Sequence, residues 1–494
     1  MVFEIKHSEI QVKLVARLMF IFLGIILALH VSQYAIYLVA GLVLYAISQK
    51  RVEFTFFALM LLVSLAIMNP VFFTKGFSFY LVTRVSLLVL AIMMTAKAGF
   101  LRSAWFLSPF VWLYAYMGYI MVASLAGWAP VISELKAVLF LIFMLALTQS
   151  VSAVVLSGFD NRAVRAAMLV VSCFYILGSV LSIPFPSIGR SMVLMQAEGW
   201  GQSLISSEMN GLFNGVTWHS QALGPTVATL NAFVLSDYLC NFKNRSRLYW
   251  LLLLSVPVLV YMTSSRTALF AYLISVFASV FFFMRERQVS AAKKSKVLMN
   301  LIFFALAAVL ILAMRPGGFA SVEGFLRKTQ ETGQIDRSDS LTESIMKSRM
   351  GLVEQGMANF RASPMIGNGF QVSEEMKEYS FSESGMILTA PIEKGVLPVM
   401  VLEEGGIFGA ILMIAFVIAV YEKYSRLRFT CFLSTFTVYL GLNSGEAAFF
   451  STSGGGGILW MICFCGLLMD VHRHRRLLSD KQTQQVTASF RRCV

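Results

Sequence analysis

A single arginine interrupts a strongly apolar part of the chain. Residues 263–267 read TSSRT and lie between the runs RLYWLLLLSVPVLVYM and ALFAYLISVFASVFFFM. If both runs cross a membrane, Arg266 lies at the tip of a tight helical hairpin. A guanidinium fixed there is suited to an anionic ligand, because arginine donates two parallel hydrogen bonds to phosphate. The alternative is a residue that extends its charged head to the membrane interface.

Two adjacent carboxylates lie near the start of another apolar segment. The run that follows Gly406 offers only about fourteen residues before Tyr421, whereas a bilayer takes about 20. The helix is therefore predicted to begin near Val396, with Glu404 about 12 Å along it at 1.5 Å per residue. A carboxylate at this depth costs about 2 to 3 kcal/mol if unpaired and is a catalytic candidate, with Glu403 beside it at a cleft. The alternative is a buried ion pair that braces the helices.

A third group of candidates lies in NGLFNGVTWHSQALGP, which leads into a further apolar segment. His219 is followed by Ser220 and Gln221 at the expected helix start, where free backbone N–H groups favour an anion. His219 is a candidate catalytic residue and Gln221 a candidate cleft residue, although a lone histidine at a membrane interface is more often structural. Glu446, in NSGEAAFF, is a weaker cleft candidate.

The elements that must position these residues are transmembrane helices. The chain is 57% hydrophobic and only 13% charged, whereas soluble domains carry roughly 25% charged residues. This composition predicts an all-α polytopic membrane protein.

Fourteen apolar runs are long enough to cross a bilayer, at about 17 to 25 residues each. They lie near residues 14–30, 31–48, 53–73, 81–100, 103–123, 133–157, 163–184, 218–240, 247–263, 265–284, 297–314, 396–420, 427–447 and 455–471. The first two are short enough to form a re-entrant pair, so we expect about 12 to 14 transmembrane helices.

The basic residues are distributed unevenly between the two sides of the membrane. With the N-terminus inside, the inner loops and both termini hold 26 of the 40 Lys and Arg residues. Outside one long loop, the outer connections hold only Lys75, Arg84, Lys136, Arg190 and Arg266. By the positive-inside rule both termini are cytoplasmic. The net charge of +14 then reflects topology and attraction to anionic membrane lipids, and no nucleic acid is needed to explain it.

Two outer segments, 185–217 and 315–395, are too long to be simple connections. The second contains apolar residues at helical spacing, which predicts an amphipathic helix from about Ser344 to Phe360. The sequence ASPMIGNGF then predicts a turn. This helix either packs on the end of the helix bundle or covers a substrate cleft, and the two are compatible. The chain accordingly divides into transmembrane helices at 1–184, further helices with an outer loop at 185–314, a large periplasmic loop at 315–395, C-terminal helices at 396–471 and a tail at 472–494.

Several kinds of chemistry leave no trace in the sequence. It contains no Walker, zinc or dinucleotide-binding motif, so neither a metal nor another cofactor is predicted. The six cysteines fall in the predicted spans or on the inner side, and no disulfide framework is expected.

Four segments, taken in order, resemble the O-antigen ligase and O-antigen polymerase superfamily of bacterial envelope glycosyltransferases. They are GLFNGVTWHSQALG at a helix start, SSRTALF, the Ser348-Arg349 pair that leads into SPMIGNGF, and EEGGIFG. They fall between about Asn210 and Gly409. Each is weak alone, whereas four in order within a matching topology are specific.

The resemblance implies a GT-C-like fold and an activity at the periplasmic face of the bacterial inner membrane. The donor would be an undecaprenyl-diphosphate-linked oligosaccharide, the acceptor would be a glycan, and no metal or nucleotide sugar would be needed. Carried over by position, Arg266 would bind the diphosphate, while His219 and Gln221 would lie at the cleft mouth. Arg349 and Arg190 are further candidates for the diphosphate.

The chain departs from the family pattern at one place. Ligases carry a His-Asn pair about nine residues before the glutamate, where this chain reads Glu393-Lys394-Gly395. Glu393 is therefore a candidate base, and Lys394 is a candidate diphosphate clamp. The departure favours an exopolysaccharide or O-unit polymerase, or a less typical ligase, over a lipid A-core ligase.

The predicted function is a metal-independent membrane glycosyltransferase that polymerises or ligates lipid-linked glycan repeat units. A polysaccharide co-polymerase and a flippase are candidate partners. The alternative function is a lipid-linked oligosaccharide flippase or other transporter, but such proteins tend to show two similar halves, and no convincing repeat is present. A scaffold for polysaccharide export, the third interpretation, would not need buried carboxylates.

Overall fold

The structure is a computed structural model of the chain, and every regular element in the part that it describes is helical. The described residues are 2–32, 35, 37, 41, 45, 52–65, 67–68, 89, 105–156, 161–185, 213–217, 220–240, 247–263, 265–286, 289–299, 341–374, 396–445, 448–451 and 455–493. In chain order the elements are α1 (Val2–Val31), α3 (Val52–Leu65), η2 (Trp105–Leu107), α5 (Phe110–Ser124), α6 (Pro130–Leu156), α7 (Asn161–Ser172), η3 (Cys173–Leu177), α8 (Gly178–Ser182), α10 (Ser220–Cys240), α11 (Arg247–Met262), α12 (Arg266–Met284), α16 (Leu341–Ala362), α18 (Leu397–Leu427), α19 (Thr430–Leu442) and α20 (Gly455–Cys493).

Five of the described helices are long and apolar enough to cross a membrane, and four apolar helices are shorter. The five are Pro130–Val155, Arg162–Ser182, Arg266–Met284, Leu397–Leu427 and Gly455–Arg475, and the four are Val15–Ala28, Phe110–Ser124, Arg247–Met262 and Thr430–Leu442. Each coincides with a predicted apolar run, and the chain is an all-α polytopic membrane protein, as predicted. The predicted runs near 31–48, 81–100 and 297–314 lie almost wholly outside the described residues.

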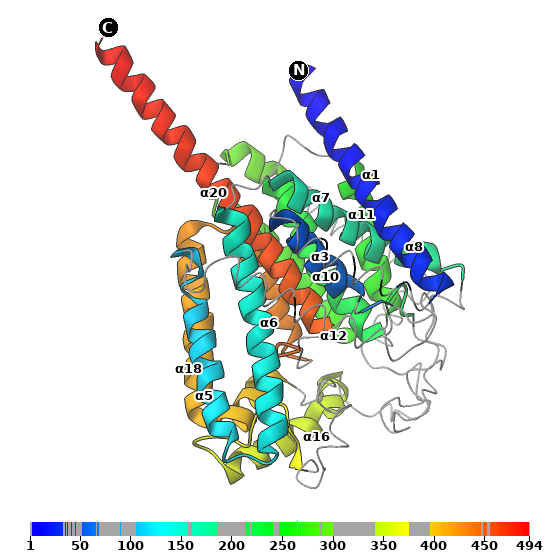
Figure 1. The fold of residues 1–494 in the computed structure, drawn as a ribbon, viewed down its shortest axis with the longest axis vertical. Coiled ribbons are helices and arrows are strands. Elements are labelled where there is room, and N and C mark those ends of the chain that lie inside the picture. Colours follow the sequence, from blue (N-terminus) through cyan, green and yellow to red (C-terminus); the bar gives the residue numbers. More distant parts are fainter. Residues whose placement is uncertain are drawn as a thin grey trace.

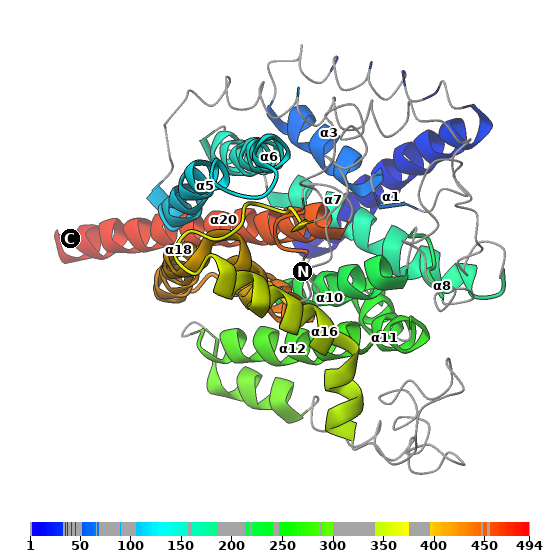
Figure 2. The same ribbon diagram turned by 90° about the horizontal axis from the view of Figure 1, so that it is seen from below.

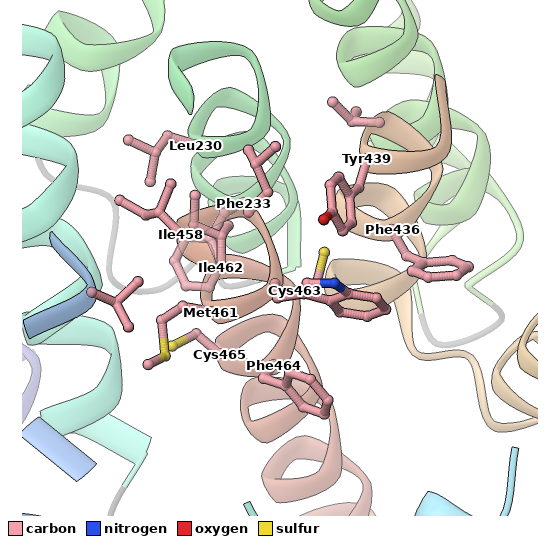
Figure 3. Close-up of a cluster of buried hydrophobic side chains, with 14 of the residues drawn as sticks. Leu230, Phe233, Phe436, Tyr439, Ile458, Met461, Ile462, Cys463, Phe464 and Cys465 are labelled. Carbon is pink, nitrogen blue, oxygen red and sulfur yellow. The ribbon is translucent and has the colours of Figure 1, made fainter. Parts of the chain in front are cut away.

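The centre of the bundle is the apolar half of α20, which packs against α19, α10, α7, α6 and α3. Its side chains lie between Leu230 and Phe233 of α10 and Phe436 and Tyr439 of α19 (Figure 3). The helices α12 and α18 instead leave large apolar side chains exposed, including Phe277 at 71%. An apolar helix that is buried all round belongs in a core, whereas an exposed apolar face belongs against lipid.

The two chain ends lie at the same end of the bundle, and α16 lies at the opposite end (Figure 1). At the end that carries the termini, α1 and α20 extend beyond the neighbouring helices (Figure 1). This arrangement matches a topology in which both termini share one side of the membrane and the large loop lies on the other.

Glycine 406 breaks α18. The helix begins at Leu397 after the N-cap Val396, as predicted, but Gly406 has φ 60° and ψ −160°, which is not helical. Only glycine adopts this conformation without strain. The break follows Glu404, which lies in the last turn of a short first half, so the two halves of α18 do not form one straight span.

The backbone groups next to this break are paired outside the helix. A bilayer contains no water to bind them, so each unpaired group would cost several kcal/mol. Their partners come from the segment 363–369, which follows α16, and from a tyrosine of α5. The hydrogen bonds are Ile407 N–H to Pro364 O (2.9 Å), Asn368 N–H to Glu403 O (2.8 Å), Gly369 N–H to Glu404 O (3.3 Å) and Tyr119 O–H to Gly405 O (3.0 Å).

Replacing Gly406 by alanine is expected to destabilise the protein by about 2 kcal/mol or more, from the strained backbone conformation alone. A Cβ atom at this position would also overlap the carbonyl oxygen of Met365. The thermal unfolding midpoint of the detergent-purified protein measures the effect. Gly118→Ala on α5 is the matched control, because a Cβ there meets nothing within 4 Å. Equal midpoints for the two variants would contradict the proposed constraint.

Candidate functional site

Arg266 lies at the first position of α12, directly after the tip of the α11–α12 hairpin, as predicted. Ser265 is the N-cap, and its side-chain oxygen accepts the backbone N–H of Ala268 at 3.2 Å. Arg266 therefore belongs to the first turn of α12, at the positive end of the helix dipole. Its side chain is partly buried, and it takes part in further contacts within the fold.

The first turns of α10 pack directly on this tip. A Cβ atom on Gly224 would overlap the side chain of Ala268 and lie 3.2 Å from Thr263 Oγ1. Gln221 lies one turn earlier on α10. The glycine therefore permits the close approach of two helix starts, and the candidate residues Gln221 and Arg266 belong to adjacent helix ends.

The end of α19 and the start of α18 meet at the same place. A Cβ on Gly445 would lie 2.8 Å from Thr267 Oγ1 and 3.0 Å from Thr267 Cγ2. The carbonyl of Asn443 accepts the backbone N–H of Leu397 at 2.8 Å. The starts of α10, α12 and α18 and the end of α19 thus converge at one end of the bundle.

The two carboxylates of EEGGIFG bind the segment around α16. Glu403 is 4% exposed, and its Oε1 accepts a hydrogen bond from Asn359 Nδ2 of α16 at 3.1 Å. Glu404 is 0% exposed, and its Oε1 accepts the backbone N–H of Gln371 at 2.8 Å. These contacts favour a role for both carboxylates in positioning this segment, and the ion pair that braces the helices stays the alternative.

The predicted amphipathic helix is confirmed as α16, which spans Leu341–Ala362 and is longer than predicted. It packs on the first half of α18, where a Cβ on Gly356 would overlap the side chain of Val399. Seen from this end of the molecule, α16 lies in front of α10 and α12 (Figure 2). Packing on the bundle is therefore observed, and the function of α16 as a cover over a cleft stays a prediction.

Several predicted site residues lie outside the described residues, and their roles stay predictions. They are Arg190, His219, Glu393, Lys394 and Glu446. Arg349 belongs to the described helix α16, but its side chain is not among the described ones.

One charged residue at this end was not singled out from the sequence. Lys136 lies in the second turn of α6, is 4% exposed, and donates to the carbonyl of Gln371 at 2.9 Å. A basic residue at the end of a span that is predicted to be the outer one opposes the positive-inside tendency. The argument that drew attention to Arg266 therefore applied to Lys136 as well.

Two groups of buried ion pairs lie towards the other end of the bundle. Arg165 near the start of α7 pairs with Asp237 near the end of α10 at 3.1 Å, and Tyr249 also donates to Asp237. Arg473 of α20 lies 3.3 Å from Glu286 and 3.4 Å from Asp470. Arg165, Asp237 and Glu286 lie close to helix ends, and both groups of pairs join different helices, as expected of pairs that brace the bundle. Within the described residues, no three His, Cys, Asp or Glu side chains cluster as metal ligands.

The fold and the site together define a polytopic membrane protein in which Arg266, Glu403, Glu404 and Lys136 lie towards the end opposite its termini. Residues 249–414, about a third of the chain, match the family model for O-antigen ligase. This match supports the resemblance to the O-antigen ligase and O-antigen polymerase superfamily. The matched segment runs from α11 to the second half of α18 and includes Arg266, Glu403 and Glu404. No curated protein matches the chain.

The contact between Gly445 and Thr267 predicts a compensating pair of substitutions. Gly445→Ala alone is expected to destabilise the protein by about 1 kcal/mol, because its Cβ meets the Thr267 side chain. Thr267→Ala removes both close atoms and leaves a Cβ contact of 3.5 Å. The double variant should therefore recover about 0.5 to 1 kcal/mol in a double-mutant cycle of unfolding free energies. Strict additivity of the two single effects would rule out the convergence of α12 and α19.

Proposed function

We propose that the protein is a metal-independent glycosyltransferase that polymerises or ligates undecaprenyl-diphosphate-linked glycan units at the periplasmic face of the bacterial inner membrane. The family supports a membrane enzyme of the ligase or polymerase type that acts on a lipid-linked glycan and an acceptor. The proposal adds the donor lipid, the face of the membrane and a role in exopolysaccharide or O-antigen biosynthesis. One observation carries it: Arg266 opens α12 at the place where four helix ends converge, inside the matched segment.

The proposed reaction is a single displacement at the anomeric carbon of the donor. A hydroxyl oxygen of the acceptor glycan attacks this carbon and forms the new glycosidic bond. The bond between the anomeric carbon and the diphosphate oxygen breaks, and undecaprenyl diphosphate leaves with the bonding electrons. Negative charge therefore builds on the diphosphate, where Arg266 and the N-terminus of α12 stabilise it. Lys394, Arg349 and Arg190 are the further proposed cationic ligands.

The acceptor proton needs a base. Glu393 and His219 are the proposed candidates, and a positioned base contributes about 10²- to 10⁴-fold. Glu404 was a third candidate, but its complete burial and its bond to the Gln371 backbone suit it less to meet an acceptor. Gln221, Glu403 and Glu446 complete the proposed cleft.

The proposed orientation places both termini in the cytoplasm and α16 in the periplasm. The separation of the termini from α16 at opposite ends of the bundle supports it (Figure 1). The excess of Lys and Arg in the predicted inner loops indicates that the end with the termini is the cytoplasmic one. A periplasmic site would take its donor from a flippase, and a polysaccharide co-polymerase is the second proposed partner.

The test is a transfer assay with the purified, reconstituted protein and undecaprenyl-diphosphate-linked repeat unit from its host, with acceptor, EDTA and no nucleotide. We expect Arg266→Ala to lower the rate by at least about 10²-fold, because it removes charge stabilisation of the leaving group. Arg266→Lys keeps the charge without the bidentate geometry and should retain an intermediate rate. The matched control is Arg426→Ala, which removes the same charge from an exposed pair with Glu422 on α18.

Two results would count against this function. Normal transfer by Arg266→Ala would remove the proposed diphosphate ligand. An unchanged donor that crosses the bilayer of wild-type proteoliposomes would instead identify a transporter.

A further inference from the structure

Gln371 holds a backbone conformation that costs energy. Its φ of 50° lies in the left-handed region, which residues other than glycine and asparagine seldom adopt. Among the described residues, Arg428 is the other non-glycine residue with a positive φ, and it is the C-cap of α18. Left-handed residues are common at such caps. Gln371 lies in a non-helical segment, so its conformation must be held by its surroundings.

Three hydrogen bonds hold Gln371, and they come from three different parts of the chain. Its N–H donates to Glu404 Oε1 of α18 at 2.8 Å, and its carbonyl accepts from Lys136 Nζ of α6 at 2.9 Å. Its side-chain Nε2 donates to the carbonyl of Phe450, which precedes α20, at 3.0 Å. Gln371 itself is 8% exposed.

The two bonds to the Gln371 backbone use a buried charge of each sign. Charge-assisted hydrogen bonds are stronger than neutral ones, and removing one partner leaves a buried polar group unsatisfied. Lys136 and Glu404 therefore bind the two ends of one residue and stabilise a conformation that its own torsional preferences oppose.

Further contacts bind residues 368–370 of the same segment to the start of α6 and to the residue Trp128 before it. Phe370 N–H donates to Ser133 Oγ at 2.6 Å, and Trp128 N–H donates to Asn368 O at 2.9 Å. The Phe370 ring packs against Phe140 of α6 at a centroid distance of 6.1 Å. The segment that repairs the break in α18 is thus bound to α6 on its other side.

We propose that Lys136 is a positioning residue of the enzyme. Together with Glu404 it holds Gln371 in the left-handed conformation, and this fixes α16 and the segment 363–374 relative to the converging starts of α12 and α18. Lys136 acts through the Gln371 peptide and does not bind substrate. The catalytic part of the proposal rests on the proposed transfer reaction, whereas the structural part does not.

The expected effect falls on turnover more than on donor binding. A displacement of about 1 Å in a site can cost about 10²-fold in rate. Lys136→Met removes the donor to Gln371 and should lower kcat by about 10- to 100-fold, while KM for the lipid-linked donor changes by less than about 3-fold. Lys136→Gln keeps an N–H donor and should retain a larger kcat than Lys136→Met. The matched control is Lys423→Met at the far end of α18, where the lysine donates to Ser108 Oγ.

The structural part is tested by hydrogen exchange of residues 363–374 in the detergent-purified full chain, which needs no activity. Lys136→Met should accelerate exchange in this segment by about 10-fold or more, while exchange in α20 stays unchanged. Lys423→Met should leave the segment protected.

A second pair of variants tests the backbone conformation of Gln371 itself. Gln371→Gly keeps both backbone bonds and adopts a positive φ without strain, so the segment should stay protected. Gln371→Val also keeps the backbone groups, but a β-branched residue is strongly disfavoured at positive φ, so protection and kcat should both fall.

The structural role and the catalytic role of Lys136 are tested separately. Unchanged hydrogen exchange in Lys136→Met, or equal protection in Gln371→Gly and Gln371→Val, would show that Lys136 does not hold the segment through Gln371. Faster exchange with unchanged kcat in Lys136→Met would show that holding the segment does not affect turnover. If the wild-type protein transfers no glycan, the proposed function is wrong, and the exchange experiment alone decides whether Lys136 anchors the segment.

Discussion

The absence of water inside a bilayer is the constraint on which this end of the molecule depends. A transmembrane helix satisfies its own backbone, so a break in it leaves polar groups that protein must pair. The break at Gly406 in α18 is tolerated because the segment after α16 supplies N–H and carbonyl groups to it. Without that segment the backbone groups at the break would lose their partners, and without the break the segment would lose its hydrogen bonds to α18. The loop outside the span and the helix within it therefore form one folding unit.

This unit also explains the glycines around the carboxylates. A Cβ on Gly405 would lie 2.9 Å from Ile120 Cδ1, and one on Gly409 would lie 3.4 Å from Tyr116 Cε2. Their small size lets α5 approach α18 closely enough for Tyr119 to donate to Gly405 O at 3.0 Å. Gly367 has φ 77°, and a Cβ there would overlap the carbonyl oxygen of Glu404. These glycines serve close backbone approach, and they bring the break, α5 and the loop into one cluster.

The helices and the helical part of the loop were predictable from the sequence, because bilayer thickness and helical periodicity act on local residues. The break was not predictable, because a glycine in a sequence does not reveal its φ and ψ. The role of Glu404 was not predictable either, since its partner Gln371 is 33 positions away and binds through a backbone group that any residue carries. Lys136 was accessible to the same topological argument as Arg266, but its partner, a carbonyl 235 positions away, leaves no signal in the side-chain pattern.

The segments SPMIGNGF and EEGGIFG, which carry part of the family resemblance, are hydrogen-bonded to each other. The described contacts of these two motifs include contacts with each other, with α5, α6 and α16, and with Trp128, Gln371 and Phe450. Several of their residue types therefore serve the pairing and packing around the break in α18. The residues expected to do chemistry, such as Glu393 and Lys394, belong to a different stretch, where this chain departs from the ligase pattern. Under the proposed function, a scaffold of this kind would hold the end of the bundle that binds the donor, while the groups that select and deprotonate the acceptor vary. The motifs thus carry the resemblance to the O-antigen ligase family, and we expect the choice of acceptor to depend on the residues between them.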